Sequence, residues 1–200
     1  MRSDAQPWEH EVHESLAAGD APGAASILFR VLGPEIAGYL AASCRDRETA
    51  REAYGRTQEA TLRGLPAFDG RASFRTWLYV VARSQLVRVL RDDARRARRC
   101  TPLDHHPEAW DRAVPQPTTQ PSASRFDELH RLRAMLSEED REILVLRVER
   151  DLPWDEVARV FAGDAADPPA VRREASRLRK RFQVIRDRVA RARGEARASA

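Results

Sequence analysis

The sequence predicts an all-α protein built from two small helical domains that a proline-rich linker joins. Apolar residues recur every three or four positions along most of the chain, as they do on one face of a helix. Helix-capping residues precede several of these stretches, and five prolines between residues 100 and 125 separate the two halves. A chain of 200 residues has room for one domain or two small ones.

Composition limits the classes of function that the chain can serve. No run approaches the roughly 20 apolar residues that span a bilayer, and the first residues lack a signal-peptide core. We therefore expect a cytoplasmic protein that does not enter a membrane, and its two cysteines, which have no C-x-x-C spacing, are expected to be free thiols. Nearly all basic residues are arginine, whose planar guanidinium suits phosphate, although codon bias in a GC-rich genome would have the same effect.

The first third of the chain is expected to hold three helical stretches. Residues 1–23 form a polar lead-in with one short helix over residues 8–17, which the glycines and proline of residues 19–23 end. Residues 24–43 are predicted to be two helical pieces or one kinked helix, because Gly33-Pro34 interrupts the apolar pattern. Asp46 is expected to cap a third helix that runs to about Arg63.

A loop and the helix that follows it carry the first candidate site. Asp69-Gly70 indicates a turn, and Ser73 is expected to cap a helix that reaches about Arg99. One face of this helix is apolar. The other is predicted to carry Arg75, Thr76, Tyr79 and Arg83. Cations interleaved with an aromatic ring suit unpaired DNA, because cations hold phosphates and rings stack on bases; the alternative is an ordinary amphipathic helix whose charges only solvate it.

The end of this helix and the linker differ sharply in composition. Residues 83–99 contain seven arginines against two aspartates, which predicts either a solvated helix end or a phosphate-facing tail. Residues 100–125 are predicted to be an extended, partly stiff linker. Asp104-His105-His106 lies within it, and we expect no metal site there because no fixed scaffold would bring ligands together.

The second half predicts a helix-turn-helix. After a helix over residues 126–136, Ser137 and Asp140 have capping-box spacing and open a helix that runs through Val148. Pro153 fits the first position of the next helix, and residues 163–169 form a turn. The last helix has a continuous apolar stripe, and its opposite face is predicted to carry Arg172, Arg173, Ser176, Arg177 and Lys180. Such a basic helix would enter the major groove; the alternative is a basic amphipathic helix used for coiled-coil pairing or solubility.

Two stretches together resemble the extracytoplasmic-function (ECF) class of sigma factors in the sigma-70 family. Residues 65–83, LPAFDGRASFRTWLYVVAR, are similar to the second conserved region of that family. Residues 136–147 and 152–158 are similar to its fourth region, and Val171-Arg172 falls where the recognition helix begins. We divide the chain into the lead-in (1–23), a region 2-like domain (24–99), the linker (100–125), a region 4-like helix-turn-helix (126–192) and a tail (193–200).

The resemblance implies a function and its partners. A sigma factor directs core RNA polymerase to specific promoters, contacting the clamp of the beta-prime subunit and the beta flap. The first domain would melt and capture the −10 element. The residues so implied are Phe68, Asp69, Arg71, Ser73, Arg75, Thr76, Tyr79 and Arg83. The second domain would read the −35 element through the five outward residues of the last helix. An anti-sigma factor is a usual partner in the family.

Polymerase binding is where the sequence departs most from the family. The resemblance places the core-binding surface at Arg51, Glu52, Gly55, Arg56 and Glu59. The family usually has an acid-rich stretch with a Gln-Glu pair here, whereas this chain has Gly55-Arg56, which reverses one charge. A sigma-like DNA-binding regulator that no longer binds core polymerase is therefore the alternative, and an adaptor that binds only protein is a third hypothesis. We find no pattern of an enzyme and expect no cofactor.

Overall fold

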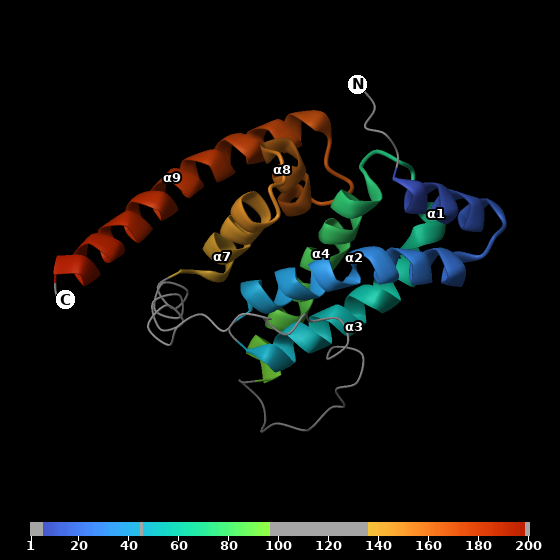
Figure 1. The fold of residues 1–200 in the computed structure, drawn as a ribbon, viewed down its shortest axis with the longest axis horizontal. Helices are drawn as coiled ribbons and strands as arrows, with labels where there is room; N and C mark the ends of the chain where they lie inside the picture. Colours follow the sequence, from blue (N-terminus) through green and yellow to red (C-terminus); the bar gives the residue numbers. More distant parts are fainter. Residues whose placement is uncertain (1–5, 45, 97–135, 199–200) are drawn as a thin grey trace. The chain divides into compact units, whose positions relative to one another are not determined.

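The structure, a computed structural model, describes residues 6–44, 46–96 and 136–198. Within these ranges every regular element is helical, as the sequence predicted, and the chain forms two units (Figure 1). The first contains helices α1 to α4 and the second contains α7 to α9. The predicted linker, the histidine pair within it, Cys100 and nearly all of the helix expected at 126–136 lie outside the described residues.

Helix α1 (Pro7–Ala17) agrees with the predicted short helix, but it is more than a polar lead-in. It packs on α2 (Ala21–Ser43), and Val12 is completely buried between them. The turn between the two helices is closed by Asp20, whose carboxylate accepts a hydrogen bond of 2.9 Å from the backbone N–H of Gly23. Because Asp20 acts as the N-cap of α2, this second helix begins at Ala21, three residues before the predicted start at residue 24.

Helix α2 is a single helix that continues through Pro34, so of the two predicted alternatives the structure excludes two separate pieces and has one helix. By length and composition it would also suit a membrane span, the one such helix in the described part of the chain, which the sequence reading had not expected. Half of that apolar window is buried inside the unit, against α1, α3 and α4. Its apolar character is thus that of a core helix.

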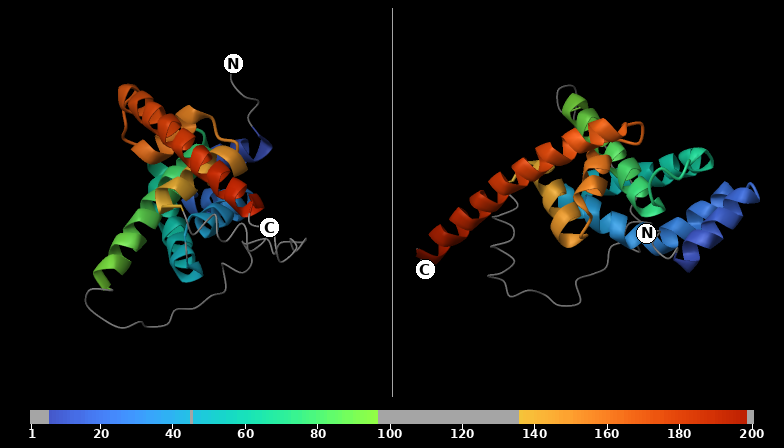
Figure 2. Two further views of the ribbon diagram at one scale, coloured as in Figure 1. Left: turned by 90° about the vertical axis from the view of Figure 1, so that its left-hand side faces the viewer. Right: turned by 90° about the horizontal axis from the view of Figure 1, so that it is seen from above.

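Helix α3 (Arg47–Gly64) lies beside α2 in all views (Figures 1 and 2). Asp46 caps it as predicted, accepting hydrogen bonds from the backbone N–H groups of Glu48 and Thr49. The two helices approach closely at Gly33 of α2, where a Cβ atom would lie 2.9 Å from the hydroxyl oxygen of Tyr54 in α3. Burial raises the pKa of Tyr54. A 3₁₀ turn (Leu65–Ala67) then leads to the loop.

Helix α4 (Phe74–Arg96) completes the first unit. Ser73 caps it as predicted, since its hydroxyl oxygen accepts a hydrogen bond of 3.1 Å from the backbone N–H of Thr76. The predicted apolar face is buried against α2 and α3, with Leu78 and Ala82 fully inaccessible to solvent. The loop before α4 is therefore attached to a helix that packs in the core of the unit.

The second unit begins with α7 (Glu138–Leu144), which Ser137 caps through a 3.1 Å hydrogen bond from the N–H of Asp140. The prediction of one regular helix through Val148 is wrong, because residues Val145–Glu149 form a π-helical turn. In this turn the N–H of Arg150 donates to the carbonyl oxygen of Val145, five residues back, at 2.9 Å.

Helix α8 (Trp154–Ala162) and helix α9 (Pro168–Ala198) form the rest of this unit. Gly163, with φ of +90°, ends α8, and Val171, Ala175, Leu178 and Ile185 of α9 are buried as the stripe predicted. An ion pair with a buried carboxylate ties α7 to α9: Arg181, which is partly exposed, donates to both carboxylate oxygens of Asp140, at 2.6 and 2.9 Å. Hydrogen bonding to this carboxylate raises the pKa of Arg181.

Candidate nucleic-acid interface

The loop before α4 is held at its base by stacked aromatic rings. Phe68 stacks on Phe74 with 4.3 Å between ring centroids, and it meets the edge of Trp77 at 5.5 Å. The tip turns at Gly70, where φ is +72°. Asp69 accepts hydrogen bonds from the backbone N–H and the Nε of Arg71, and the backbone bond lowers the pKa of Asp69. The exposed tip is thus ordered by contacts within the loop itself.

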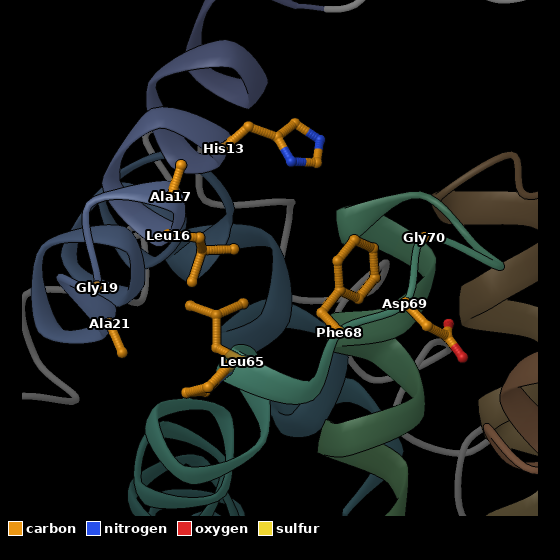
Figure 3. A pocket seen from close by; sticks show the side chains of 10 residues that line it. His13, Leu16, Ala17, Gly19, Ala21, Leu65, Phe68, Asp69 and Gly70 are labelled. Atoms are coloured by element: carbon orange, nitrogen blue, oxygen red, sulfur yellow. The ribbon is translucent and has the colours of Figure 1, made fainter.

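A pocket of about 490 Å³ lies between this loop and α1. Figure 3 shows His13 and Leu16 projecting from α1 toward the side occupied by Leu65 and Phe68. Asp69 lines the pocket but turns its carboxylate away from it, as the same view shows. Apolar walls with one imidazole beside them suit a flat heterocyclic ring such as a nucleobase.

The contribution of α1 to this pocket was missed by the sequence reading. His13 lies far from the loop in the sequence, yet its ring centroid is 4.9 Å from that of Phe74. Trp8 approaches the same phenylalanine, at 6.4 Å. No local pattern predicts these contacts, because they depend on how α1 folds back on α2.

The predicted polar face of α4 is only partly exposed. Thr76 and Tyr79 are buried, at 1% and 0% exposure, so the prediction that they face solvent along a captured strand is wrong. The helical wheel separates the two faces of α4 but does not reveal that α2 covers part of the polar one. Arg75 and Arg83 are half-buried, and Ser73 remains exposed.

Glu35 of α2 forms hydrogen bonds with two side chains of this covered face. Its Oε1 accepts hydrogen bonds from the Nε and Nη2 of Arg75, the first at 2.8 Å, and from the hydroxyl of Tyr79 at 2.7 Å. The ring of Tyr79 meets that of Tyr39 edge-on at 5.2 Å. A cation that the sequence assigned to DNA is therefore paired with a carboxylate of the same unit.

The predicted recognition face on α9 is exposed, as the periodicity indicated. Arg172, Arg173, Ser176, Arg177 and Lys180 all reach solvent. They differ in charge environment, because Arg177 pairs with Glu174 at 2.7 Å and with Glu139 of α7 at 2.6 Å. The hydrogen bonds that Arg177 donates, first to Glu174 and then to Glu139, raise the pKa of Arg177. Two carboxylate partners therefore offset the charge of Arg177.

The surface that the resemblance assigns to polymerase binding lies along α3. Its members Arg51, Glu52, Gly55 and Arg56 are half-exposed and Glu59 is exposed. Arg56 is held between two carboxylates, with Glu52 at 2.6 Å and Asp92 of α4 at 2.8 Å. Hydrogen bonding to Asp92 raises the pKa of Arg56. The reversed charge at this position is thus offset locally by two acidic neighbours.

Metal-ligating residues do not gather in the part of the chain that the structure describes, where no three His, Cys, Asp or Glu side chains are placed to share an ion. The exposed face of α9 is cationic, and the loop before α4 places the ring of Phe68 beside a pocket. Such an arrangement can bind phosphates and bases.

Known proteins share both the sequence and the fold of this chain. Residues 28–96 match the family described as Sigma-70 region 2. Over 135 residues the chain is 28% identical to the RNA polymerase sigma factor YlaC of Bacillus subtilis, covering 67% of this chain and 77% of YlaC. The structure of the sigma factor RpoE in complex with the anti-sigma factor NepR from Bartonella quintana matches with a TM-score of 0.53 and 15% identity. This match covers 80% of this chain and 94% of the other, and it shows a common helical fold.

Proposed function

We propose that this chain is a sigma factor of the sigma-70 family, which binds core RNA polymerase and directs it to specific promoters. The observation that carries the proposal is the family match over residues 28–96, which spans most of α2, all of α3 and α4, and the loop between the last two. A sigma factor is an initiation factor that acts with polymerase in the cytoplasm. We therefore assign the chain no catalytic residue and no cofactor.

The loop and the pocket beside it are the proposed site for a separated promoter strand at the −10 element. An unpaired base would enter between His13 and Phe68, while Arg71 at the exposed tip would approach the backbone. Extruding a base from the stack costs a few kcal/mol, which stacking and pocket contacts offset. Three residues would shape this site. Phe68 would stack on Phe74, Asp69 would hold the turn of the loop, and Ser73 would cap the helix that follows.

Helix α9 is the proposed reader of the −35 element as a duplex. Its exposed cations would release counterions from DNA phosphates, so the affinity would fall as salt rises. Arg172, Arg173 and Lys180 are the stronger candidates for direct contact, because Arg177 already has two carboxylate partners. Ser176 lies between them and donates its hydroxyl to the carbonyl oxygen of Arg172.

The exposed side of α3 is the proposed contact with the polymerase clamp. Glu52 and Glu59 would supply carboxylates to this contact, and Asp92 adds a further carboxylate beside Arg56. The division into a region 2-like domain (24–99), a linker (100–125) and a region 4-like domain (126–192) belongs to the same proposal. RpoE was solved with an anti-sigma factor, and a partner of that kind is proposed for this chain as well.

Run-off transcription with core polymerase tests the proposed function. With the purified chain, core polymerase should synthesise one defined transcript from a cognate promoter, which core enzyme alone should not make. Polymerase subunits should also co-purify with the chain from its own cells. A chain that binds promoter DNA but neither binds core enzyme nor supports a transcript would contradict the proposal and favour the sigma-like regulator.

A further inference from the structure

Glu35 occupies a position between the core and the proposed DNA strand that no motif predicts. A single oxygen, Oε1, accepts hydrogen bonds from Arg75 and from Tyr79, and all three side chains belong to the first unit. The side chain of Glu35 is 22% exposed and that of Arg75 is 36% exposed, so solvent reaches the ion pair from one side. Tyr79 is fully buried and fixes the carboxylate from the other side.

The position of Arg75 makes this pair relevant to DNA. It is the second residue of α4, two positions after the capping residue Ser73 and close in sequence to the loop tip. A guanidinium binds carboxylate and phosphate through the same fork of donors, so the two anions compete for it. A DNA strand that follows the loop would bring a phosphate close to Arg75, which is already paired with Glu35.

We infer that Glu35 is a positioning residue that holds Arg75 in the free protein and weakens its attraction for the phosphate backbone of a separated strand. This inference rests on the proposed strand site at the loop. To bind a DNA phosphate, Arg75 must first break its ion pair with the carboxylate of Glu35. The freed carboxylate then attracts a cation from solution. Fewer ions are then released on binding than the number of phosphate contacts predicts.

The variant Glu35→Gln tests the inference in the full-length chain. The amide oxygen of glutamine still accepts hydrogen bonds from Arg75 and Tyr79, so the fold is expected to persist, but the negative charge is removed. Binding to a fluorescein-labelled oligothymidine, measured by anisotropy at several salt concentrations, should tighten by about two- to fivefold. The slope of log affinity against log salt should become steeper by about 0.7, the value for one phosphate on a single strand.

Three further variants separate this effect from a change in overall charge. Glu11→Gln removes the same charge from another ion pair of the unit, that with Arg30 at 3.1 Å, and should leave both affinity and slope unchanged. In an Arg75→Ala background, Glu35→Gln should give no gain. Glu35→Asp, which keeps the charge, should retain the slope of the parent chain.

The outcomes are distinguishable from failure of the proposed function. If the parent chain binds the oligothymidine and Glu35→Gln neither tightens binding nor changes the slope, the inference is wrong and the strand site stands. An equal gain from Glu11→Gln, or a gain that survives Arg75→Ala, would also overturn it. If no variant binds the strand at all, the strand site and the inference fail together.

Discussion

Arg56 on α3 and Asp92 on α4 form an ion pair with a nitrogen–oxygen distance of 2.8 Å, although 36 residues separate them in the sequence. The same guanidinium donates to Glu52 one turn earlier on α3, at 2.6 Å. The residue that departs from the family in the proposed polymerase-binding surface is therefore a connection between two helices of the core.

Removing this connection should destabilise the first unit. Arg56→Ala is expected to lower the free energy of unfolding by about 0.5–1 kcal/mol, because the side chains of the pair are only about one-third exposed and the network includes two carboxylates. Urea unfolding of the parent and variant chains measures the difference. Arg63→Ala breaks a pair of 3.8 Å whose side chains are 72% and 70% exposed, and it should change little; an equal loss in both variants would contradict this role of Arg56.

Gly55 and Gly33 should respond in opposite ways to alanine. A Cβ atom on Gly55 would meet nothing within 4 Å, so Gly55→Ala should stabilise α3 by about 0.5–1 kcal/mol through helix propensity. The same change at Gly33 would place the atom 2.9 Å from the Tyr54 hydroxyl and should cost about 1–3 kcal/mol. Thermal unfolding of the two variants compares them, and a loss of stability in Gly55→Ala would show that this site is not open.

Filling the pocket beside the loop should weaken binding of an unpaired strand. Ala17 lines the pocket and is exposed, so Ala17→Trp would occupy the pocket without disturbing the core, and a loss of about 1–3 kcal/mol in binding energy is expected, the value of one stacked base. Fluorescence anisotropy with a single-stranded oligonucleotide measures it. Ala18→Trp is the matched control, because Ala18 is exposed but does not line the pocket. Equal behaviour of the two variants would remove the pocket from the proposed site.

Cations on α9 should differ in their contribution to duplex binding. Arg173→Ala is expected to lower the salt slope by about 1 if the residue contacts a phosphate, or to cost about 1–3 kcal/mol and relax the sequence preference if it contacts a base. Arg177→Ala should have a smaller effect, since Glu174 and Glu139 already offset its charge. Salt titrations with promoter duplex measure both. A larger effect at Arg177 than at Arg173 would show that DNA displaces the two carboxylates.

Sequence alone predicted the features that depend on neighbouring residues. The caps Asp46, Ser73 and Ser137 each satisfy backbone groups two or three positions ahead, so their chemistry can be read locally, and all three are confirmed. The all-α class and the resemblance to ECF sigma factors are confirmed as well. The roles of the individual DNA- and polymerase-contacting residues remain predictions.

Features that depend on packing between distant helices could not be predicted. Tyr79 lies on the polar side of its own helix, yet it is buried because α2 supplies Glu35 to receive its hydroxyl. His13 reaches the loop only because α1 folds back on α2. The π-helical turn after α7 also escaped prediction, since its apolar residues fit an ordinary helix equally well.

The pair between Asp140 and Arg181 has a consequence for how DNA would be approached. Arg181 of α9 donates two parallel hydrogen bonds to the carboxylate of Asp140, and this geometry permits little rotation of α9 about its own axis. The contact with α7 therefore determines which face of α9 points outward. Arg173 and Lys180 point outward partly because of this constraint, although neither touches Asp140. A substitution at Asp140, which is itself buried, is therefore expected to change the direction in which the exposed face of α9 points.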